Sequence, residues 1–311
     1  MSPAPAAAVA HIAEQRANFH RELFRRNILT SSTCAKSETG YIASNGDSGQ
    51  KFSSTLSHKL AERLASDVGQ SLPILPKKRD GQSLGNDFEA LCQEFIRSCF
   101  LKMDHLRPGE WVIEQVGGRS EDKVSKYAQY SHLADLKRLA EQNTGLASFL
   151  GNGYTVAPDV IIARRPEPDS TINGGQTVLV DDTVATMATL RERNYSSGSA
   201  EEILHASVSC KFTMRSDRAQ NTRTEALNLL RNRKGRSPHI VSVTAEPTPS
   251  RIASLALGTG DVDCVYHFAL FELKELLEAS DKWEDALDQL NVMIEGKRLR
   301  DISDLPLDLA V

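Results

Sequence analysis

Three separated stretches of this chain carry acids and a lysine that a hydrolytic site could use. Asp159 follows Pro158 at the start of an apolar run, and Ser209 and Lys211 share the polar face of an alternating stretch. Glu225 lies fourteen residues beyond Lys211 in a segment with helical spacing. Carboxylates hold Mg²⁺, which lowers the pKa of a bound water and neutralises charge at phosphorus. A lysine can orient or deprotonate that water, or stabilise negative charge, so the set suits phosphodiester hydrolysis.

Each of these residues also has an ordinary structural explanation. An aspartate in a strand is more often a strand-end or turn residue than a ligand, and a lysine at a strand end is usually solvated. Glu225 could merely pair with Arg218 or Arg223 on its own helix. Only the combination of the three stretches therefore favours a catalytic site.

Two arginines flank an aspartate directly beyond this lysine, as Arg215, Asp217 and Arg218. The planar fork of arginine matches the two acceptors of a guanine edge, and an aspartate accepts from cytosine amino groups. A good bidentate pair contributes roughly 1–3 kcal/mol of discrimination. An intrahelical ion pair contributes only ~0.5 kcal/mol and specifies nothing. The group therefore predicts a reader of adjacent G·C pairs, at a helix N-terminus that can enter a major groove.

The distribution of charge matters more than its total for the choice of partner. The net charge of −4 argues weakly against nucleic acid. Residues 211–236, however, hold eight basic and two acidic residues, so they carry +6 and the rest of the chain −10. A basic island on an acidic body fits a phosphate-binding cleft. The alternative is a solvated helix with a favourable basic C-terminus.

Hydrophobic periodicity predicts alternating helices and strands. Helices are expected over residues 11–27, 53–65, 84–104, 131–142, from 216 onward, 250–258, 272–280 and 282–297. Strands are expected over residues 110–116, 154–165, 204–212, 239–247 and 264–271. The polar stretch 30–50 is expected to be a loop. This order indicates one α/β domain over residues 1–311, with a central mixed β-sheet flanked by helices on both faces and residues 1–20 as a frayed extension.

Composition limits the protein class. The chain has 40% hydrophobic and 25% charged residues, which is ordinary for a globular protein. No apolar run approaches the ~18 residues of a membrane span. Five cysteines are an odd number without framework spacing, so free thiols in a reducing cytoplasm are expected.

Long runs of the chain resemble the NgoMIV-like type II restriction endonucleases, a CCGG-cutting group of the PD-(D/E)xK nuclease superfamily. The similarity is carried by SCKFTMRSDRAQNTRTEALNLLRNRKGR, PHIVSVTAEPTPSRIASLALGTGDVDCVYHFAL, GKRLRDISDLPLDLAV, GQSLGNDFEALCQEF, HLRPGEW, EQVGGRS and YTVAPDVII. The resemblance implies a restriction-endonuclease-like core and Mg²⁺-dependent hydrolysis of double-stranded DNA at GCCGGC. It also implies cutting after the first G, 5′ CCGG overhangs, a bacterial cytoplasmic enzyme, and homotetramers made of two dimers.

The resemblance implies a catalytic role for several residues. Asp159 would be the metal-bridging aspartate and Lys211 the catalytic lysine. Ser209 stands two residues before the lysine, where most of the superfamily has an acid, and Glu225 would supply that acid from the helix. The implied metal ligands are Asp159, Glu225 and the main-chain carbonyl of Cys210. Glu89 matches an additional active-site glutamate.

The resemblance also implies DNA contacts in both grooves. Those in the major groove would read the central CCGG and the outer G·C pair, and they are Arg215, Asp217, Arg218 and, for the outer pair, Arg251. Asp47 and Gln82 match minor-groove contacts, where the guanine amino group is the only donor. The sequence departs from the family over residues 1–20, 71–81 and 164–176, which affects oligomer contacts and the flanking-base preference.

Two alternatives remain open at this stage. One keeps the nuclease but relaxes or changes the bases that flank CCGG. The other is a sequence-specific DNA-binding protein without catalysis. A purely structural or protein-binding module gives no reason for two arginines to flank an aspartate beside Lys211.

Overall fold

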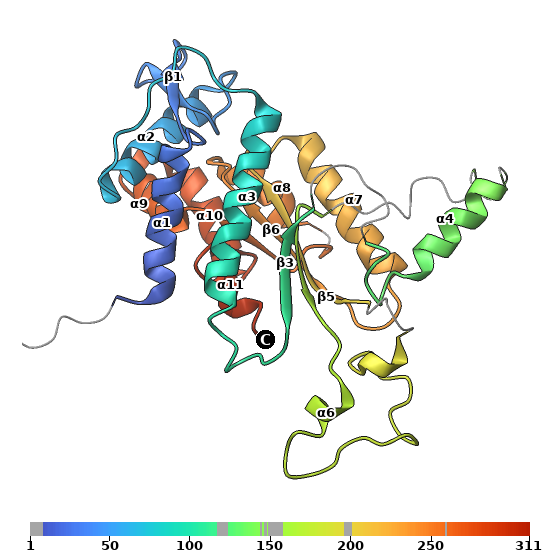
Figure 1. Cartoon of the computed structure of the whole chain (residues 1–311). Coiled ribbons are helices and arrows are strands. Elements are labelled where there is room, and N and C mark those ends of the chain that lie inside the picture. Colours follow the sequence, from blue (N-terminus) through green and yellow to red (C-terminus); the bar gives the residue numbers. More distant parts are fainter. Residues whose placement is uncertain are drawn as a thin grey trace, which may run out of the picture.

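A six-stranded mixed sheet forms the centre of the computed structural model (Figure 1). The structure describes residues 9–116, 124–143, 145, 148, 158–195, 201–258 and 260–311. Within these ranges the sheet has the order β3 (Trp111–Gln115), β4 (Val160–Arg164), β5 (Ile203–Lys211), β6 (His239–Thr244), β7 (Cys264–His267), β8 (Leu299–Asp301). β3, β4 and β5 pair antiparallel, and β5 to β8 pair parallel. The expected mixed sheet is confirmed.

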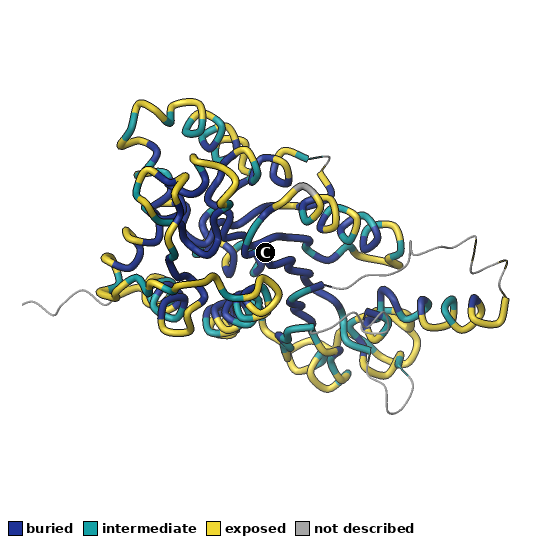
Figure 2. Tube along the Cα trace, turned by 90° about the horizontal axis from the view of Figure 1, so that it is seen from above, coloured by how far each residue is buried: buried dark blue, intermediate teal, exposed yellow. Residues whose placement is uncertain are grey.

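Helices enclose this sheet, and Figure 2 shows the buried trace in the middle with exposed segments around it. The longer ones are α1 (His11–Arg25), α2 (Lys51–Asp67), α3 (Gly81–Phe100), α4 (His132–Gln142), α7 (Ser216–Asn232), α8 (Pro249–Ala256), α9 (Leu270–Glu278) and α10 (Glu284–Glu295). Short helical turns are α6 (Asp169–Ile172), η1 (Glu192–Asn194), η2 (Asp281–Trp283) and α11 (Leu305–Asp308). Among the described residues, no helix is both long and apolar enough to cross a bilayer.

The alternation of β5 decides which helix covers which face. Cys210 points to the face of α3, where its thiol meets that of Cys92. Ser209 points to the opposite face, where its hydroxyl lies 3.4 Å from the hydroxyl of Thr222 in α7. Successive strand residues point to opposite faces. The sheet is therefore covered on both faces, as expected.

The expected loop at residues 30–50 contains a β-hairpin, β1 (Ser31–Thr33) with β2 (Tyr41–Ala43), so that part of the prediction was wrong. Each strand has only three residues, which is too short to show hydrophobic alternation, and only β1 is polar, since Ile42 and Ala43 of β2 are buried. Helix α2 lies against the hairpin: the Ser57 hydroxyl accepts from the Ala43 amide at 3.4 Å. Strand β8 and α11 were also not predicted, and residues 154–157 of the expected strand lie outside the described residues.

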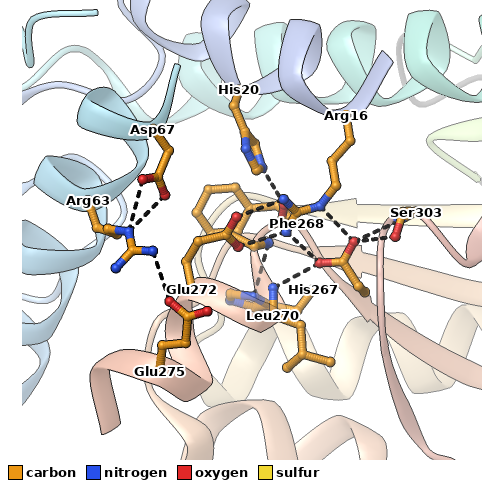
Figure 3. Close-up of polar contacts among 12 residues, drawn as sticks. Arg16, His20, Arg63, Asp67, His267, Phe268, Leu270, Glu272, Glu275 and Ser303 are labelled. Carbon is orange, nitrogen blue, oxygen red and sulfur yellow. Dashed lines mark hydrogen bonds and ion pairs between the residues drawn. The ribbon is translucent and has the colours of Figure 1, made fainter. Parts of the chain in front are cut away.

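The expectation of a frayed extension over residues 1–20 is wrong for its described part. Helix α1 begins at His11, and Phe19 and His20 are buried. Arg16 forms ion pairs with Glu272 in α9 and Asp301 in β8, and the His20 ring donates to the carbonyl of Phe268 at 2.8 Å (Figure 3). The N-terminal helix is thus an integral part of the core.

All five cysteines lie within the described ranges, and each is free and buried. This agrees with the expectation of free thiols, although it does not identify a compartment.

Candidate active site and DNA-binding surface

Asp159, Ser209 and Lys211 meet at one carboxylate oxygen. Asp159 directly precedes β4, and Lys211 ends the neighbouring strand β5. The Asp159 Oδ2 atom accepts from Lys211 Nζ at 2.7 Å, from the Cys210 backbone N–H at 2.7 Å and from Ser209 Oγ at 3.4 Å. The antiparallel pairing of β4 and β5 therefore brings together residues about fifty positions apart in the chain.

Two glutamates reach this point from opposite sides of the sheet. Glu89 comes from α3, where Gln115 Nε2 donates to it at 3.3 Å, and Glu225 comes from α7. Burial and the charge of Asp159 raise the pKa of Glu89 to about 7. Burial also raises the pKa of Glu225 to about 7, although Lys211 opposes the shift. Burial disfavours the charge of Lys211, but Asp159 and Glu225 outweigh it and raise its pKa.

The residues present fit a divalent cation. Carboxylates that are part-buried and repel one another keep their charge best beside a hard cation. Among the described residues no three His, Cys, Asp or Glu side chains group closely enough to hold a metal by themselves. Mg²⁺ does not need such a group, because it is usually held by one or two carboxylates with waters and phosphate oxygens, and a main-chain carbonyl can add a further ligand.

The carbonyl of Cys210 is placed to supply that ligand. The ladder between β4 and β5 ends at the pair Val160 and Val208, before Cys210. Neighbouring carbonyls of a strand point to opposite sides, and that of Lys211 accepts from the Ala245 amide at 3.1 Å, toward β6. The Cys210 carbonyl therefore faces β4, beyond the end of the ladder, on the side of Asp159.

The expected DNA-reading residues gather near the start of α7. Arg215 is the N-cap residue of α7 and Asp217 lies in its first turn, and both are exposed. Arg218 donates to the hydroxyl of Thr213 at 2.5 Å and to its carbonyl at 3.3 Å. These bonds fix the Arg218 guanidinium beside the end of β5, close to the Asp159 and Lys211 pair.

A cavity of about 360 Å³ joins most of the expected DNA contacts. Its lining includes Asp47, Arg215, Arg218 and Arg251. A neighbouring cavity of about 680 Å³ shares Asp47, Arg215 and Arg251 and adds Arg223. Gln82 and Asp217 do not line either cavity. Gln82 lies in the first turn of α3, where its backbone N–H donates to the carboxylate of the N-cap residue Asp80 at 3.1 Å.

Asp47 and Arg251 were expected in different grooves, but they contact each other. Arg251 in α8 donates to Asp47, and its Nη1 atom lies 3.8 Å from Glu246. The Arg251 guanidinium and the backbone N–H of Gly49 hold the pKa of Asp47 below its usual range. In the chain without DNA, the two residues thus form an ion pair that would have to open for each to reach its own groove.

Lys78 and Arg79 line the same cavity and were missed by sequence reasoning. Desolvation in the cavity, and then the charges of Arg215 and Arg218, lower the pKa of Lys78. Its Nζ donates to the Gly46 carbonyl at 3.4 Å. The signal in the sequence was the basic run PKKR at residues 76–79, in a stretch that departs from the family.

The raised pKa values of Glu89 and Glu225 predict a pH dependence of stability. A folded carboxyl with a pKa near 7 binds a proton that the unfolded chain releases near pH 4.5. The stabilisation is therefore complete below about pH 4.5 and is lost as pH rises through 7. We expect metal-free protein to lose on the order of 1 kcal/mol per carboxyl between pH 5 and 8. Thermal melts across this range, with and without Mg²⁺, measure the loss.

Variants separate this effect from general pH sensitivity. Glu225→Gln should flatten the dependence of Tm on pH, because one titrating carboxyl is gone. Glu295→Gln, at an exposed position of α10, should leave it as in the wild type. Equal pH slopes in the two variants would show that Glu225 does not titrate near neutrality. Added Mg²⁺ should raise Tm most at pH 8, where the carboxylates are ionised.

Comparison with known proteins identifies the family. The NgoMIV restriction enzyme family, as represented by its sequence profile, matches residues 19–311. The type II restriction enzyme NgoMIV of Neisseria gonorrhoeae is 50% identical over 299 residues, which span 96% of this chain and 98% of that enzyme.

Similarity to solved structures is weaker. The type IIF restriction endonuclease Bse634I with cognate DNA aligns at 16% identity and a TM-score of 0.37, over 71% of this chain and 84% of that chain. A complex of restriction endonuclease PspGI with substrate DNA aligns at 14% identity and a TM-score of 0.24, over 97% of this chain and 92% of that chain. The family is therefore decided by the sequence matches: the chain belongs to the NgoMIV restriction enzyme family, and it is a type II restriction endonuclease.

Proposed function

We propose that this enzyme is Mg²⁺-dependent, and that it cuts double-stranded DNA at GCCGGC after the first G to leave 5′ CCGG overhangs. The observation that carries the proposal is the joining of Asp159 and Lys211 at 2.7 Å, four residues before Arg215. The residues proposed for hydrolysis and those proposed to read guanine would thus act side by side. The family membership removes the alternative of a DNA-binding protein without catalysis.

The chemistry follows from the residues around the scissile phosphate. Asp159, Glu225 and the Cys210 carbonyl would hold Mg²⁺, which when bound supplies an activated water and charge neutralisation. Lys211 keeps its proton at neutral pH, because Asp159 and Glu225 raise its pKa, so it stabilises negative charge on the phosphate oxygens. Glu89 has a pKa of about 7 and can exchange a proton near neutrality.

Base recognition would come from the start of α7 and from α8. Arg215 and Arg218 would donate to guanines, and Asp217 would accept from cytosines, in the major groove. Arg251 would contact the outer G·C pair after leaving Asp47, which would turn to the minor groove with Gln82. Without the Arg251 contact the target would relax to CCGG with other flanks.

Mapped digestion tests the site and the cofactor together. We expect plasmid DNA with two GCCGGC sites to be cut at both in Mg²⁺ and to stay intact in EDTA. Sequencing the ends should give four-base CCGG overhangs. Cuts at CCGG with other flanks would replace the proposed site by the relaxed alternative. Plasmid that binds the protein in Mg²⁺ yet remains intact would contradict the proposal.

Lys78 is expected to add one phosphate contact to the DNA complex. It stands in the cavity beside Arg215 and Arg218, where its ammonium faces other cations and would gain a counter-charge from DNA. Lys78→Ala should lower the slope of log affinity against log salt by about one unit, with sequence preference unchanged. Anisotropy titrations at several salt concentrations, in Ca²⁺, measure this slope.

Lys77 supplies the matched control for this prediction. It is the exposed neighbour of Lys78 and does not line either cavity. Lys77→Ala should keep the wild-type slope. If both variants keep it, Lys78 does not touch DNA.

A homotetramer of two dimers is proposed for the assembly. A palindromic site requires at least a two-fold dimer, since each subunit reads one half. Further association is supported by the segment of residues 165–195, which extends away from the sheet around α6 (Figure 1). It exposes four large apolar side chains, Val178, Leu179, Val184 and Met187. Exposed apolar groups of this kind mark interaction surfaces. We expect the assembly to work in the bacterial cytoplasm, where its buried thiols stay reduced.

A further inference from the structure

A separate cavity of about 640 Å³ lies at the end of the sheet opposite Lys211. Its floor includes Ile203 to His205 at the start of β5, Arg164 at the end of β4 and Trp111 at the start of β3. Lys211 ends the same β5, eight residues on, at roughly 25 Å for an extended strand. We propose that this Trp111 cavity binds the terminal phosphate group of an organic phosphate. Its volume lies in the usual range of small-molecule sites.

The charge of the cavity is almost all of one sign. Its lining holds four cations, Arg107, Arg164, Lys234 and Arg236, and one acid, Glu201. Arg107 donates to neutral acceptors, the Ala310 carbonyl at 3.3 Å and the His205 ring at 3.4 Å. Among the described residues no carboxylate lies within ion-pair distance of Arg107, Lys234 or Arg236. The lining therefore carries an excess of positive charge that an anion could neutralise.

Arg164 is held in place with an unused donor. One of its terminal nitrogens donates to Glu167 at 3.1 Å, but its Nε atom is buried and has no partner. The Arg164 and Arg107 guanidinium groups lie 5.8 and 5.5 Å from the centre of the Trp111 ring. Gly109 has a φ of 140°, and a Cβ there would stand 2.5 Å from Arg164 Nε. The backbone thus leaves the room that this guanidinium needs.

The two histidines near the cavity, His205 and His239, provide no charge that could balance these cations. Burial lowers the pKa of His205 to about 3. The charge of Arg107 acts in the same direction, whereas the hydrogen bond to the Leu309 carbonyl opposes the shift. Burial also lowers the pKa of His239, although Asp263 opposes the shift. Burial, Arg236 and Arg164 together lower the pKa of Arg107 itself. The charges of Arg236 and Arg164 therefore disfavour the charge of Arg107, and a bound anion would relieve this repulsion.

The shape of the cavity selects the kind of anion. Guanidinium forks match phosphate oxygens in two-point contacts. The apolar side chains of Leu190 and Ile203 lie in the same lining as Tyr195. A phosphate attached to an organic body would meet both parts. Such a group comes from a free nucleotide or from the terminal phosphate of a DNA strand, and the two share this chemistry.

Calorimetric titration of the full-length enzyme tests the proposal, without divalent cations. The probes are ATP, inorganic phosphate and a 5′-phosphorylated duplex that lacks GCCGGC. We expect saturable binding of ATP or of the phosphorylated duplex, weakened roughly tenfold or more by Arg236→Gln, since charge-assisted bonds to phosphate are lost. Whichever of ATP and the phosphorylated duplex binds more tightly identifies the source of the phosphate group. Inorganic phosphate should bind more weakly than either, because it lacks the organic body.

Controls locate the binding. Arg236 is exposed, so Arg236→Gln should fold. Arg215→Gln, in the other cavity, should bind ATP like the wild type. Binding that is lost in Arg215→Gln, unchanged in Arg236→Gln, or absent for all three probes would overturn the proposal. Each of these outcomes is independent of whether GCCGGC is the cleaved site.

Discussion

Lys211→Ala is expected to lower the cleavage rate of GCCGGC DNA by roughly 10²–10⁴-fold and to leave DNA affinity in Ca²⁺ nearly unchanged. The Lys211 ammonium lies 2.7 Å from the Asp159 carboxylate and is the cation that faces the carboxylates there. Its loss should remove charge stabilisation at the phosphate, whereas Arg215, Asp217 and Arg218, which are proposed to read the bases, remain. Single-turnover cleavage in Mg²⁺ and anisotropy in Ca²⁺ separate the two effects.

A second substitution tests whether Lys211 acts by its positive charge or by transferring a proton. Lys211→Arg keeps a positive charge but holds its proton over the whole accessible pH range. If charge alone acts, the arginine variant should recover most of the lost rate with the same pH profile. If the proton is transferred, the arginine variant should stay as slow as Lys211→Ala. A rate for Lys211→Ala within tenfold of the wild type would show that this residue is not part of the chemistry.

Arg16→Ala is expected to cost about 3–5 kcal/mol of folding stability, because it leaves two buried carboxylates without a partner. Arg16 donates to both oxygens of Glu272 at 2.7 Å and to both oxygens of Asp301 at 2.8 Å (Figure 3). Asp301 also accepts the Leu270 backbone N–H at 3.0 Å. One guanidinium therefore joins α1 to α9 and to β8. Denaturant unfolding at a fixed protein concentration measures the loss.

Arg63 offers a matched comparison in the same region (Figure 3). It pairs with Asp67 and Glu275, but its side chain is 46% exposed, against 14% for Arg16. Arg63→Ala should therefore cost no more than ~1 kcal/mol. Equal losses in the two variants would mean that burial does not decide the strength of the Arg16 cluster. Because α1 packs on α3, which carries Glu89, loss of Arg16 should also lower cleavage at elevated temperature.

Local sequence patterns predicted the structure correctly where a single helix or strand shows its own hydrophobic period. The alternation in β5 and the apolar stripe of α3 repeat with periods of 2 and 3.6, and these periods directly encode a strand and a helix. The alternation alone would leave the polar face of β5 in solvent, but α7 covers that face and the strand is buried on both sides. The spacing of Ser209, Lys211 and Arg215 lies within one strand and the turn after it, so it could be read without the fold. The family, and with it the endonuclease activity, also followed from long runs of sequence.

Contacts between distant segments could be decided only by the tertiary structure. Arg16 was placed in a frayed extension because its partners are 256 and 285 residues away, and no local pattern announces them. The β1–β2 hairpin was missed because its strands have only three residues each, so its apolar residues Ile42 and Ala43 show no local period, and they are buried only when α2 packs on the hairpin. The ion pair of Asp47 with Arg251 spans 204 residues, and the Trp111 cavity draws its cations from three separate segments. The sequence by itself determined which chemical groups the chain carries, and the hydrophobic period of each helix and strand. Only folding decided which groups share a low-dielectric space, and that proximity controls their charge, their pKa and what they can bind.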